Sequence, residues 1–258
     1  MSIQADELKF SYGRKVVLDG VSFDVPDGCL CAVLGPNGTG KTTLFKCILG
    51  MLQKYTGEIK IDGTVTKNLS AKELAHRVAY IPQSHNQTFD YSVLDMVLMG
   101  TDHSLSVFAA PGKEEIKKAE DALERVGISY LEGKLFSHLS GGEQQLVLVA
   151  RALAQGSHTL LMDEPTSALD YGNQSMVLEQ ARTLADTGYC VILSTHTPQQ
   201  ALWYADMALA LNKGKVAAFG SPKDVLNEML IEELYGVKTR FIETEEGTLI
   251  SPGLKDRQ

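Results

Sequence analysis

The sequence predicts an α/β fold in which an antiparallel β subdomain precedes the core and a helical subdomain is inserted into it. Three observations support this prediction. An apolar run at residues 29–34 is followed by a glycine-rich stretch and then by apolar residues at helical spacing. Apolar runs at 159–162 and 189–194 have the length of buried strands. From about residue 84 to 139, apolar residues recur at helical spacing instead. We therefore expect one domain, residues 1–258, with a helical subdomain at about 84–155.

Composition narrows the class of protein. The 258 residues carry a formal net charge of −8, which argues against nucleic acid as the main partner. No apolar run approaches the roughly 18 residues that a membrane helix needs, and the first ten residues lack a signal-peptide pattern. We expect a cytoplasmic protein that reaches a membrane only through a partner. Its four cysteines, Cys29, Cys31, Cys47 and Cys190, are expected to be reduced thiols in the core.

The segments before the glycine-rich stretch predict the antiparallel subdomain. Residues 8–12 alternate apolar and polar side chains, as a half-buried strand does, and residues 16–25 form a second strand-like stretch. Pro26, Asp27 and Gly28 then signal a turn. Residues 57–61 and 78–81 are expected to be further short strands.

The segments after it predict mostly helices. Ile116, Ala119, Leu123 and Val126 give an amphipathic helix, and residues 142–155 give another. Residues 207–219, interrupted at Asn212, Lys213 and Gly214, are expected to form a hairpin. The tail from Ser221 is expected to hold one or two short helices and a final strand.

The glycine-rich stretch has the spacing of a phosphate-binding loop. Gly35 is followed by four residues and then by Gly40, Lys41 and Thr42. Glycines let the backbone N–H groups approach phosphate oxygens, and the helix that follows favours an anion at its N-terminus. The alternative, a glycine-rich surface turn, does not explain the lysine, the hydroxyl and the flanking strand and helix together. The predicted phosphate loop comprises Gly35, Pro36, Asn37, Gly38, Thr39, Gly40, Lys41, Thr42 and Thr43.

Two acids end the apolar run 159–162. Asp163 is suited to hold Mg²⁺, which prefers oxygen ligands, and Glu164 is suited to accept a proton from a water molecule. The alternative is a pair of solvated acids at the end of a strand. Because adjacent strand residues point to opposite sides, we expect the two carboxylates to have different roles, with Asp163 facing the phosphate loop.

Residues 139–143 read Leu-Ser-Gly-Gly-Glu at the start of a predicted helix. Ser140 and Glu143 fit a capping box, in which each side chain satisfies a backbone donor of the other residue. Two glycines at a helix N-terminus also suit an anion. A capping role and a phosphate-binding role are compatible, and both remain open.

Together these motifs resemble those of the ATP-binding subunit of an ABC transporter, over nearly the whole chain. They occur in the order of that family: residues 35–43, Gln83 in Tyr-Ile-Pro-Gln, residues 139–143, Asp163 with Glu164, residues 167–170, and His196 in Ser-Thr-His. The resemblance implies an ABC-type phosphate-loop NTPase core that uses ATP and Mg²⁺.

The resemblance also implies roles for single residues. Tyr12 would stack on adenine, Asp170 would cross a dimer interface, and His196 would contact the γ-phosphate. Gln83 would touch Mg²⁺ and sense a permease. Two of these residues have a plain structural alternative: Tyr12 as an ordinary strand tyrosine and His196 as a surface residue. The implied catalytic residues are Lys41, Glu164 and His196, the implied metal ligands are Thr42, Gln83 and Asp163, and the second phosphate contact is Ser140, Gly141, Gly142 and Glu143.

An assembly is implied as well. Two chains would pair head to tail around two ATP molecules, and residues 139–143 of one chain would close on the phosphates held by Lys41 of the other. Two copies of a membrane permease, and indirectly a substrate-binding protein, would complete the complex. Residues 83–99 would form part of the permease-facing surface. The family commonly has Gln at the position of Glu143, so the carboxylate here is expected to weaken nucleotide affinity slightly.

Residues 93–100, 108–112, 169–174 and 233–237 resemble the branch that imports metal chelates such as ferric siderophores, haem and cobalamin. One alternative is a chromosome- or repair-type ATPase, which would carry a long heptad insertion that this chain lacks. The other is a cytosolic ABC ATPase that acts on ribosomes or in iron–sulfur cluster assembly.

Overall fold

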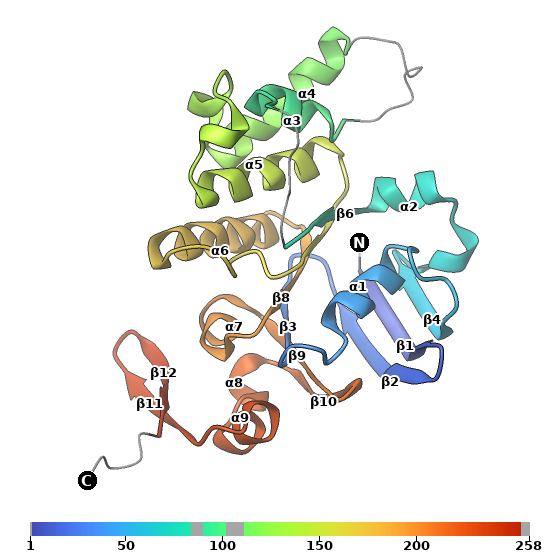
Figure 1. Cartoon of the computed structure of the whole chain (residues 1–258), viewed down its shortest axis with the longest axis vertical. Coiled ribbons are helices and arrows are strands. Elements are labelled where there is room, and N and C mark those ends of the chain that lie inside the picture. The colour runs from blue at the N-terminus through green and yellow to red at the C-terminus, as the bar shows by residue number, and fades with distance from the viewer. Residues whose placement is uncertain (1, 84–89, 102–110, 254–258) are drawn as a thin grey trace.

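The computed structural model describes residues 2–83, 90–101 and 111–253. At its centre is a six-stranded sheet with the order β10-β9-β3-β8-β7-β6. All neighbouring strands in it are parallel except β9 and β10, which form the predicted hairpin (Figure 1). The strands are β3 (Leu30–Leu34), β6 (Val78–Ile81), β7 (Thr159–Met162), β8 (Cys190–Thr195), β9 (Met207–Asn212) and β10 (Lys215–Gly220).

A second sheet is antiparallel, as predicted, and has the order β2-β1-β4-β5. Its strand β1 begins well before residue 8, because Ile3 and Ala5 are already buried and paired with β2 and β4. The sheet also includes residues 57–61, which were predicted as a strand without being assigned to either sheet. The strands are β1 (Ile3–Tyr12), β2 (Lys15–Val25), β4 (Thr56–Ile61) and β5 (Thr64–Val65).

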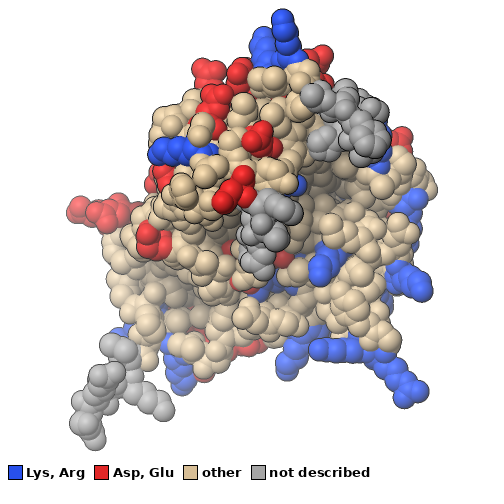
Figure 2. Space-filling model, turned by 45° about the horizontal axis from the view of Figure 1, so that its top comes forward, with Lys and Arg blue, Asp and Glu red and all other residues tan. Residues whose placement is uncertain are grey.

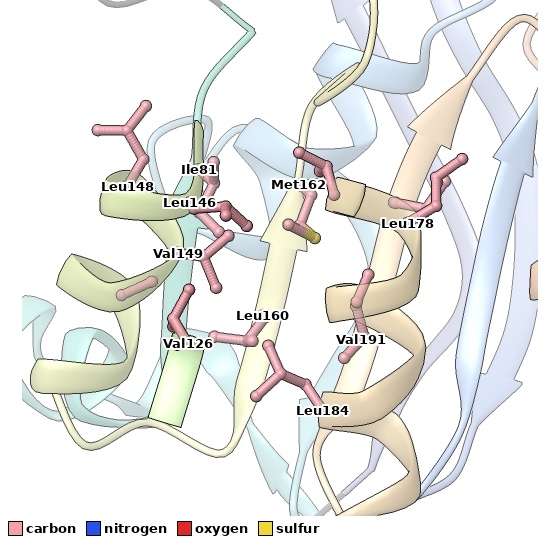
Figure 3. Packing of buried hydrophobic residues seen from close by; sticks show 14 of the residues in the cluster. Ile81, Val126, Leu146, Leu148, Val149, Leu160, Met162, Leu178, Leu184 and Val191 are labelled. Carbon is pink, nitrogen blue, oxygen red and sulfur yellow. The ribbon is translucent and has the colours of Figure 1, made fainter. Parts of the chain in front are cut away.

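The two faces of the central sheet belong to two cores. Leu30, Ala32 and Leu34 of β3 face a core shared with α5 (Gly141–Ala154) and α6 (Tyr171–Asp186). Cys31 and Val33 face the other core, which α1 (Lys41–Ile48) and the antiparallel sheet complete. Figure 3 shows the first face, where Leu160 and Met162 of β7 lie between side chains of α5 and α6. This alternation is the period of two that a strand buried on both faces requires.

The described part of the predicted helical subdomain consists of α3 (Val93–Leu98), α4 (Lys113–Val126) and α5, with short 3₁₀ turns at Ser129–Leu131 and Phe136–His138. Ala119, Leu123 and Val126 of α4 are buried as their spacing predicted. Residues 84–89, which belong to the expected permease-facing surface, and 102–110, which include part of the string at 108–112, lie outside the described residues. In the described part of the chain, we find no helix with the length and apolar character to cross a membrane.

The sequence missed three helices and misjudged the tail. Helices α2 (Ala71–Arg77), α6 and α7 (Pro198–Tyr204) were not predicted. The tail holds two short helices, α8 (Pro222–Val225) and α9 (Glu228–Tyr235), and then a hairpin of β11 (Thr239–Thr244) and β12 (Gly247–Pro252). The single final strand was therefore wrong. The side chains of β11 and β12 are mostly exposed or half-buried, so their sequence carries little apolar alternation.

All four cysteines are buried free thiols, as expected. Cys29 and Cys31 lie in the same core, although β3 itself begins at Leu30. Burial raises the pKa of Cys29 to about 11 and the pKa values of Cys47 and Cys190 to about 12. Thiols with such pKa values stay protonated and unreactive near neutral pH.

Charged side chains of both signs share the face of the molecule shown in Figure 2. Asp and Glu gather toward the upper left of that view, and Lys and Arg along its lower right edge.

Candidate functional site

The carboxyl ends of the parallel strands bring the predicted site residues to one edge of the sheet. The phosphate loop follows β3, Gln83 follows β6, Asp163 follows β7 and His196 follows β8. In open parallel sheets this edge is where ligands bind. Residues that lie more than a hundred positions apart in the chain are thereby placed side by side.

A cavity of about 620 Å³ lies at this edge, at the phosphate loop. Tyr12, whose side chain is 48% exposed, forms one wall and packs edge-to-face on Phe10. The cavity is large enough for a nucleotide. Its lining residues are Tyr12, Lys15, Val16, Val17, Asn37, Gly38, Gly40, Lys41, Thr42, Thr43, Gln83, Glu164, Lys213 and Gly214.

The phosphate loop needs its glycines. Gly35 and Gly40 have φ values of 148° and 109°, which other residues rarely adopt. A Cβ atom on Gly35 would lie 2.5 Å from the Leu211 carbonyl oxygen, and one on Gly40 would lie 2.8 Å from Leu18. Gly40 caps α1 without a side-chain hydrogen bond, so the first N–H groups of the helix stay available to an anion.

Lys41 is buried, with only 5% of its side chain exposed, and is turned back onto its own loop. Its Nζ donates to the carbonyl oxygens of Gly35 at 2.7 Å and Pro36 at 3.3 Å. It also forms an ion pair with Glu164 Oε1 at 3.4 Å. The Thr39 hydroxyl donates to the same Pro36 oxygen at 2.9 Å. The lysine therefore satisfies its charge within the protein in this arrangement.

Glu164 is the residue on which the site converges. Besides Lys41, its carboxylate accepts from Gln83 Nε2 at 3.1 Å and lies 3.7 Å from His196 Nδ1. Its side chain is 12% exposed. Its φ of 46° is left-handed, a conformation that costs about 1–3 kcal/mol in a non-glycine residue. The backbone N–H of Glu164 donates to Ser194 Oγ at 2.9 Å, which helps to hold this turn.

Asp163 has different partners from its neighbour. It is 3% exposed and accepts hydrogen bonds from Ser194 Oγ at 2.6 Å and from the Tyr80 hydroxyl at 3.3 Å. Burial and the adjacent carboxylate raise the pKa of Tyr80 to about 12. We expected Asp163 to face the phosphate loop, but it is Glu164 that contacts Lys41 here. The two adjacent carboxylates do occupy different environments.

Residues 139–143, which we call the signature loop, form the N-terminus of α5. Ser140 and Glu143 make the predicted capping box: the Glu143 N–H donates to Ser140 Oγ at 3.3 Å, and the Ser140 N–H and hydroxyl both donate to Glu143 Oε2 at 2.9 Å. These donors lower the pKa of Glu143. None of the residues of the signature loop, all of which the structure describes, lines the cavity at the phosphate loop.

Gly141 and Gly142 pack closely on the segment that carries Asp170. Cβ atoms on the two glycines would lie 3.0 Å from Leu169 and 2.2 Å from Asn173, respectively. Asp170 caps α6 and accepts from the Asn173 N–H at 2.9 Å. The signature loop and residues 167–170 therefore form one continuous surface.

The sequence missed several residues of the cavity. Lys15 lies beside Tyr12 in the register of the hairpin between β1 and β2, which the turn at residues 13–14 could have indicated. Lys213 and Gly214 come from the turn between β9 and β10, where the Gly214 carbonyl accepts from the Asp19 N–H at 2.8 Å. Only the tertiary fold brings that turn to the cavity.

Tyr235, the last residue of α9, was also missed. Its hydroxyl is buried and makes no hydrogen bond to the residues that the structure describes. Burial raises its pKa to about 12.

Comparisons with known proteins agree with this geometry. Residues 18–167 match the model of the ABC transporter family. The chain is 37% identical over 237 residues to a probable iron chelatin transport ATP-binding protein of Helicobacter pylori, covering 91% of this chain and 93% of the relative. It is 35% identical over 254 residues to a hemin import ATP-binding protein of Rhodococcus jostii, covering 98% and 86%.

A solved structure gives the same result. A metal-chelate type ABC transporter in an inward-facing conformation superposes with a TM-score of 0.85 at 32% identity and covers 98% of both chains. The chain therefore belongs to the ABC transporter family, as an ATP-binding subunit that hydrolyses ATP.

Proposed function

We propose that this protein powers the import of a metal chelate, such as a ferric siderophore or haem, across a cell membrane. The observation that supports this most strongly is the match over nearly the full length to a metal-chelate type transporter. Relatives named for iron chelatin, hemin and ferric enterobactin transport point to the same class of substrate.

In this proposal ATP occupies the cavity at the phosphate loop. The backbone N–H groups of residues 35–43 and the ammonium of Lys41 bind the β- and γ-phosphates, and Tyr12 stacks on the adenine. Lys41 has to leave the carbonyl oxygens of Gly35 and Pro36 to do so. The ion pair between Lys41 and Glu164 breaks in the same step, which frees Glu164 for catalysis.

The donors around the cavity fit Mg²⁺. Thr42 and Gln83 line it, and Asp163, which is not among the lining residues, follows β7 at the same edge of the sheet. In the described residues there is no cluster of three His, Cys, Asp or Glu side chains that could hold a metal without further ligands. Mg²⁺ suits such a sparse set because it keeps waters and shares phosphate oxygens. Bound there, the ion would neutralise charge that develops on the phosphates.

Glu164 and His196 act on the transferred phosphoryl group. Glu164 accepts a proton from the attacking water, and His196, 53% exposed and 3.7 Å from the Glu164 carboxylate, contacts the γ-phosphate. Gln83 joins Glu164 to the segment that leads to Asp170, because its Nε2 donates both to Glu164 and to Ser167 Oγ at 3.3 Å.

The assembly is a head-to-tail dimer of this chain on two permease subunits at the inner face of the membrane. The signature loop supports it, because its glycines and helix N-terminus suit an anion although it lies apart from its own chain's cavity. The nucleotide that the signature loop contacts is then the one held by a second copy of the chain. A substrate-binding protein delivers the chelate to the outer side of the permease.

Reconstitution tests this function. The chain is co-expressed with the permease encoded beside its gene and placed in proteoliposomes, with the matching binding protein added empty, with a ferric siderophore, with haem or with cobalamin. We expect one loaded form to stimulate ATP hydrolysis and drive uptake, and Lys41→Ala to abolish both. A chain that does not associate with that permease and instead sediments with ribosomes would contradict the proposal.

A further inference from the structure

A chain of side-chain amides joins the loop that carries His196 to the loop that carries Asp170. Gln200 of α7, 9% exposed, is its centre. Gln200 Oε1 accepts from the Thr195 hydroxyl at 2.8 Å and from the Thr166 hydroxyl at 3.3 Å. Thr195 in turn accepts from the Thr197 N–H at 3.1 Å. The residues on both sides of His196 are thus tied to Gln200.

Gln174 of α6 continues this chain. Gln200 Nε2 donates to Gln174 Oε1 at 3.2 Å, and Gln174 Nε2 donates to the Leu169 carbonyl oxygen at 2.9 Å. The oxygen of each amide accepts a hydrogen bond from one neighbour and its nitrogen donates to the next, so the orientations of both amides are fixed. A buried amide that loses one hydrogen-bond partner still bears the free-energy cost of its removal from water. The hydrogen-bonded residues of this series should therefore move together.

This series of hydrogen bonds ends at the signature loop. Asn173 donates from its backbone N–H and from Nδ2 to the two carboxylate oxygens of Asp170, both at 2.9 Å. The same Asn173 side chain fills the space that a Cβ atom on Gly142 would need. A displacement of residues 169–173 therefore presses directly on Gly142.

We propose that Gln200 and Gln174 are positioning residues that couple the histidine at this chain's own ATP site to its signature loop, which serves the second ATP. The inference rests on the head-to-tail dimer proposed above. It gives a single chain a physical route between the two sites: Thr195, Gln200, Gln174, Leu169, Asp170, Asn173 and Gly142. Contact of His196 with a γ-phosphate at one site then sets the position of the loop that binds ATP at the other.

Gln199 provides a matched control, because it has the same side chain in the same helix but other partners. Gln199 Nε2 donates to the Thr248 carbonyl oxygen at 2.9 Å, and its Oε1 accepts from the Ile250 N–H at 2.7 Å. These hydrogen bonds hold the hairpin of β11 and β12 and do not reach residues 164–174. Gln199→Ala therefore removes an amide of equal size without interrupting the chain to the signature loop.

The test measures ATP hydrolysis by the complete permease complex as a function of MgATP concentration. The unaltered complex should be cooperative, with a Hill coefficient clearly above 1. We expect Gln200→Ala to bring the Hill coefficient close to 1, which means a loss of at least about fivefold in the coupling between the two sites, the smaller end of typical coupling factors. The affinity of the separate subunit for MgATP should change less than twofold, because neither glutamine lines the cavity.

Two further variants separate coupling from a loss of stability. Gln200→Glu keeps the shape but places an acceptor against Gln174 Oε1, so it should behave like Gln200→Ala. Gln174→Ala combined with Gln200→Ala should lower cooperativity no further than Gln200→Ala alone, because both residues belong to one chain of bonds.

The outcomes distinguish this inference from the function on which it rests. An unaltered complex without ATP hydrolysis, or with independent sites, would overturn the proposed dimer mechanism and the inference with it. A cooperative complex in which Gln200→Ala behaves like Gln199→Ala would overturn the inference alone. Additive losses from Gln174→Ala and Gln200→Ala would also overturn it.

Discussion

At the scale of single residues, Glu164 and Lys41 form an ion pair at the phosphate loop. Their ion pair spans 3.4 Å, and both side chains are largely withdrawn from water. A buried charge that loses its partner is costly. In the proposed function, nucleotide phosphates replace the carboxylate as the partner of Lys41, and Gln83 and His196 are the other side chains beside Glu164.

Lys41→Ala tests the phosphate loop. Removing the ammonium should lower ATP hydrolysis by about 10²-fold or more, because stabilisation of charge is the largest part of such catalysis. MgATP binding, measured by calorimetry, should largely disappear. Lys46→Ala, in the last turn of the same helix, should leave both nearly unchanged. Hydrolysis at a near-normal rate in Lys41→Ala would mean that the loop does not bind the phosphates.

Glu143 gives a pH-dependent prediction. Its pKa is lowered in the folded protein by the donors of Ser140, so its ionised form stabilises the start of α5. That stabilisation is present above the ordinary glutamate pKa of about 4.5 and is lost as the pH falls through the lowered pKa.

Denaturant unfolding of the unaltered protein and of Glu143→Gln should therefore show a stability difference that is constant near neutral pH and shrinks below about pH 4.5. Glu120→Gln, an exposed position of α4, serves as the control and should show no comparable pH-dependent difference. A difference for Glu143→Gln that is independent of pH would contradict the role of the ionised carboxylate.

At the scale of elements, capping alone does not mark a functional helix. Ser70 with Glu73 caps α2, and Ser92 with Asp95 caps α3, in the same way as Ser140 with Glu143 caps α5. What distinguishes α5 is the close packing of its first glycines on Leu169 and Asn173.

Gly142→Ala tests this packing. A Cβ atom there would lie 2.2 Å from Asn173 Oδ1, so α5 or α6 must shift. Overpacking of this kind costs about 1–3 kcal/mol of stability, and we expect ATP hydrolysis by the complex to fall with little change in MgATP binding to the separate subunit. Gly133→Ala, where a Cβ atom would meet nothing within 4 Å, is the control. Equal behaviour of the two variants would show that the close approach has no consequence.

The elements also show what the sequence could and could not predict. The sequence placed the phosphate loop, Gln83, Asp163, Glu164 and His196 after short apolar segments. These segments are strands of the central sheet, and its parallel strands align their carboxyl ends at one edge. Helix α6 was missed although its buried residues, Val177, Leu178, Ala181, Leu184 and Ala185, recur at helical spacing.

Other features depend on contacts that no local pattern records. Lys213 reaches the cavity only because the turn between β9 and β10 is bonded to β2 through Asp19. The hairpin of β11 and β12 is held by Gln199 of α7, far away in the sequence. The partners of Asp163, Ser194 and Tyr80, come from the two strands beside β7 and were equally hidden.

At the scale of the whole molecule, the proposed head-to-tail dimer gives one chain parts of two different ATP sites. The cavity at the phosphate loop and the signature loop lie apart, and the hydrogen bonds of Gln200 and Gln174 connect their surroundings. In this proposal a single chain binds ATP and a second chain encloses it. Adjacent Asp163 and Glu164 should affect these two steps differently, because they have separate partners.

The most direct test of the central claim is the molar mass of two variants with and without MgATP, measured by light scattering after size exclusion. Glu164→Gln should bind MgATP, hydrolyse it about 10²–10⁴-fold more slowly, and run as a dimer only with MgATP. Asp163→Asn should bind MgATP more weakly and stay monomeric. If Glu164→Gln stays monomeric at saturating MgATP while Asp163→Asn dimerises, the assigned roles of the two carboxylates are contradicted.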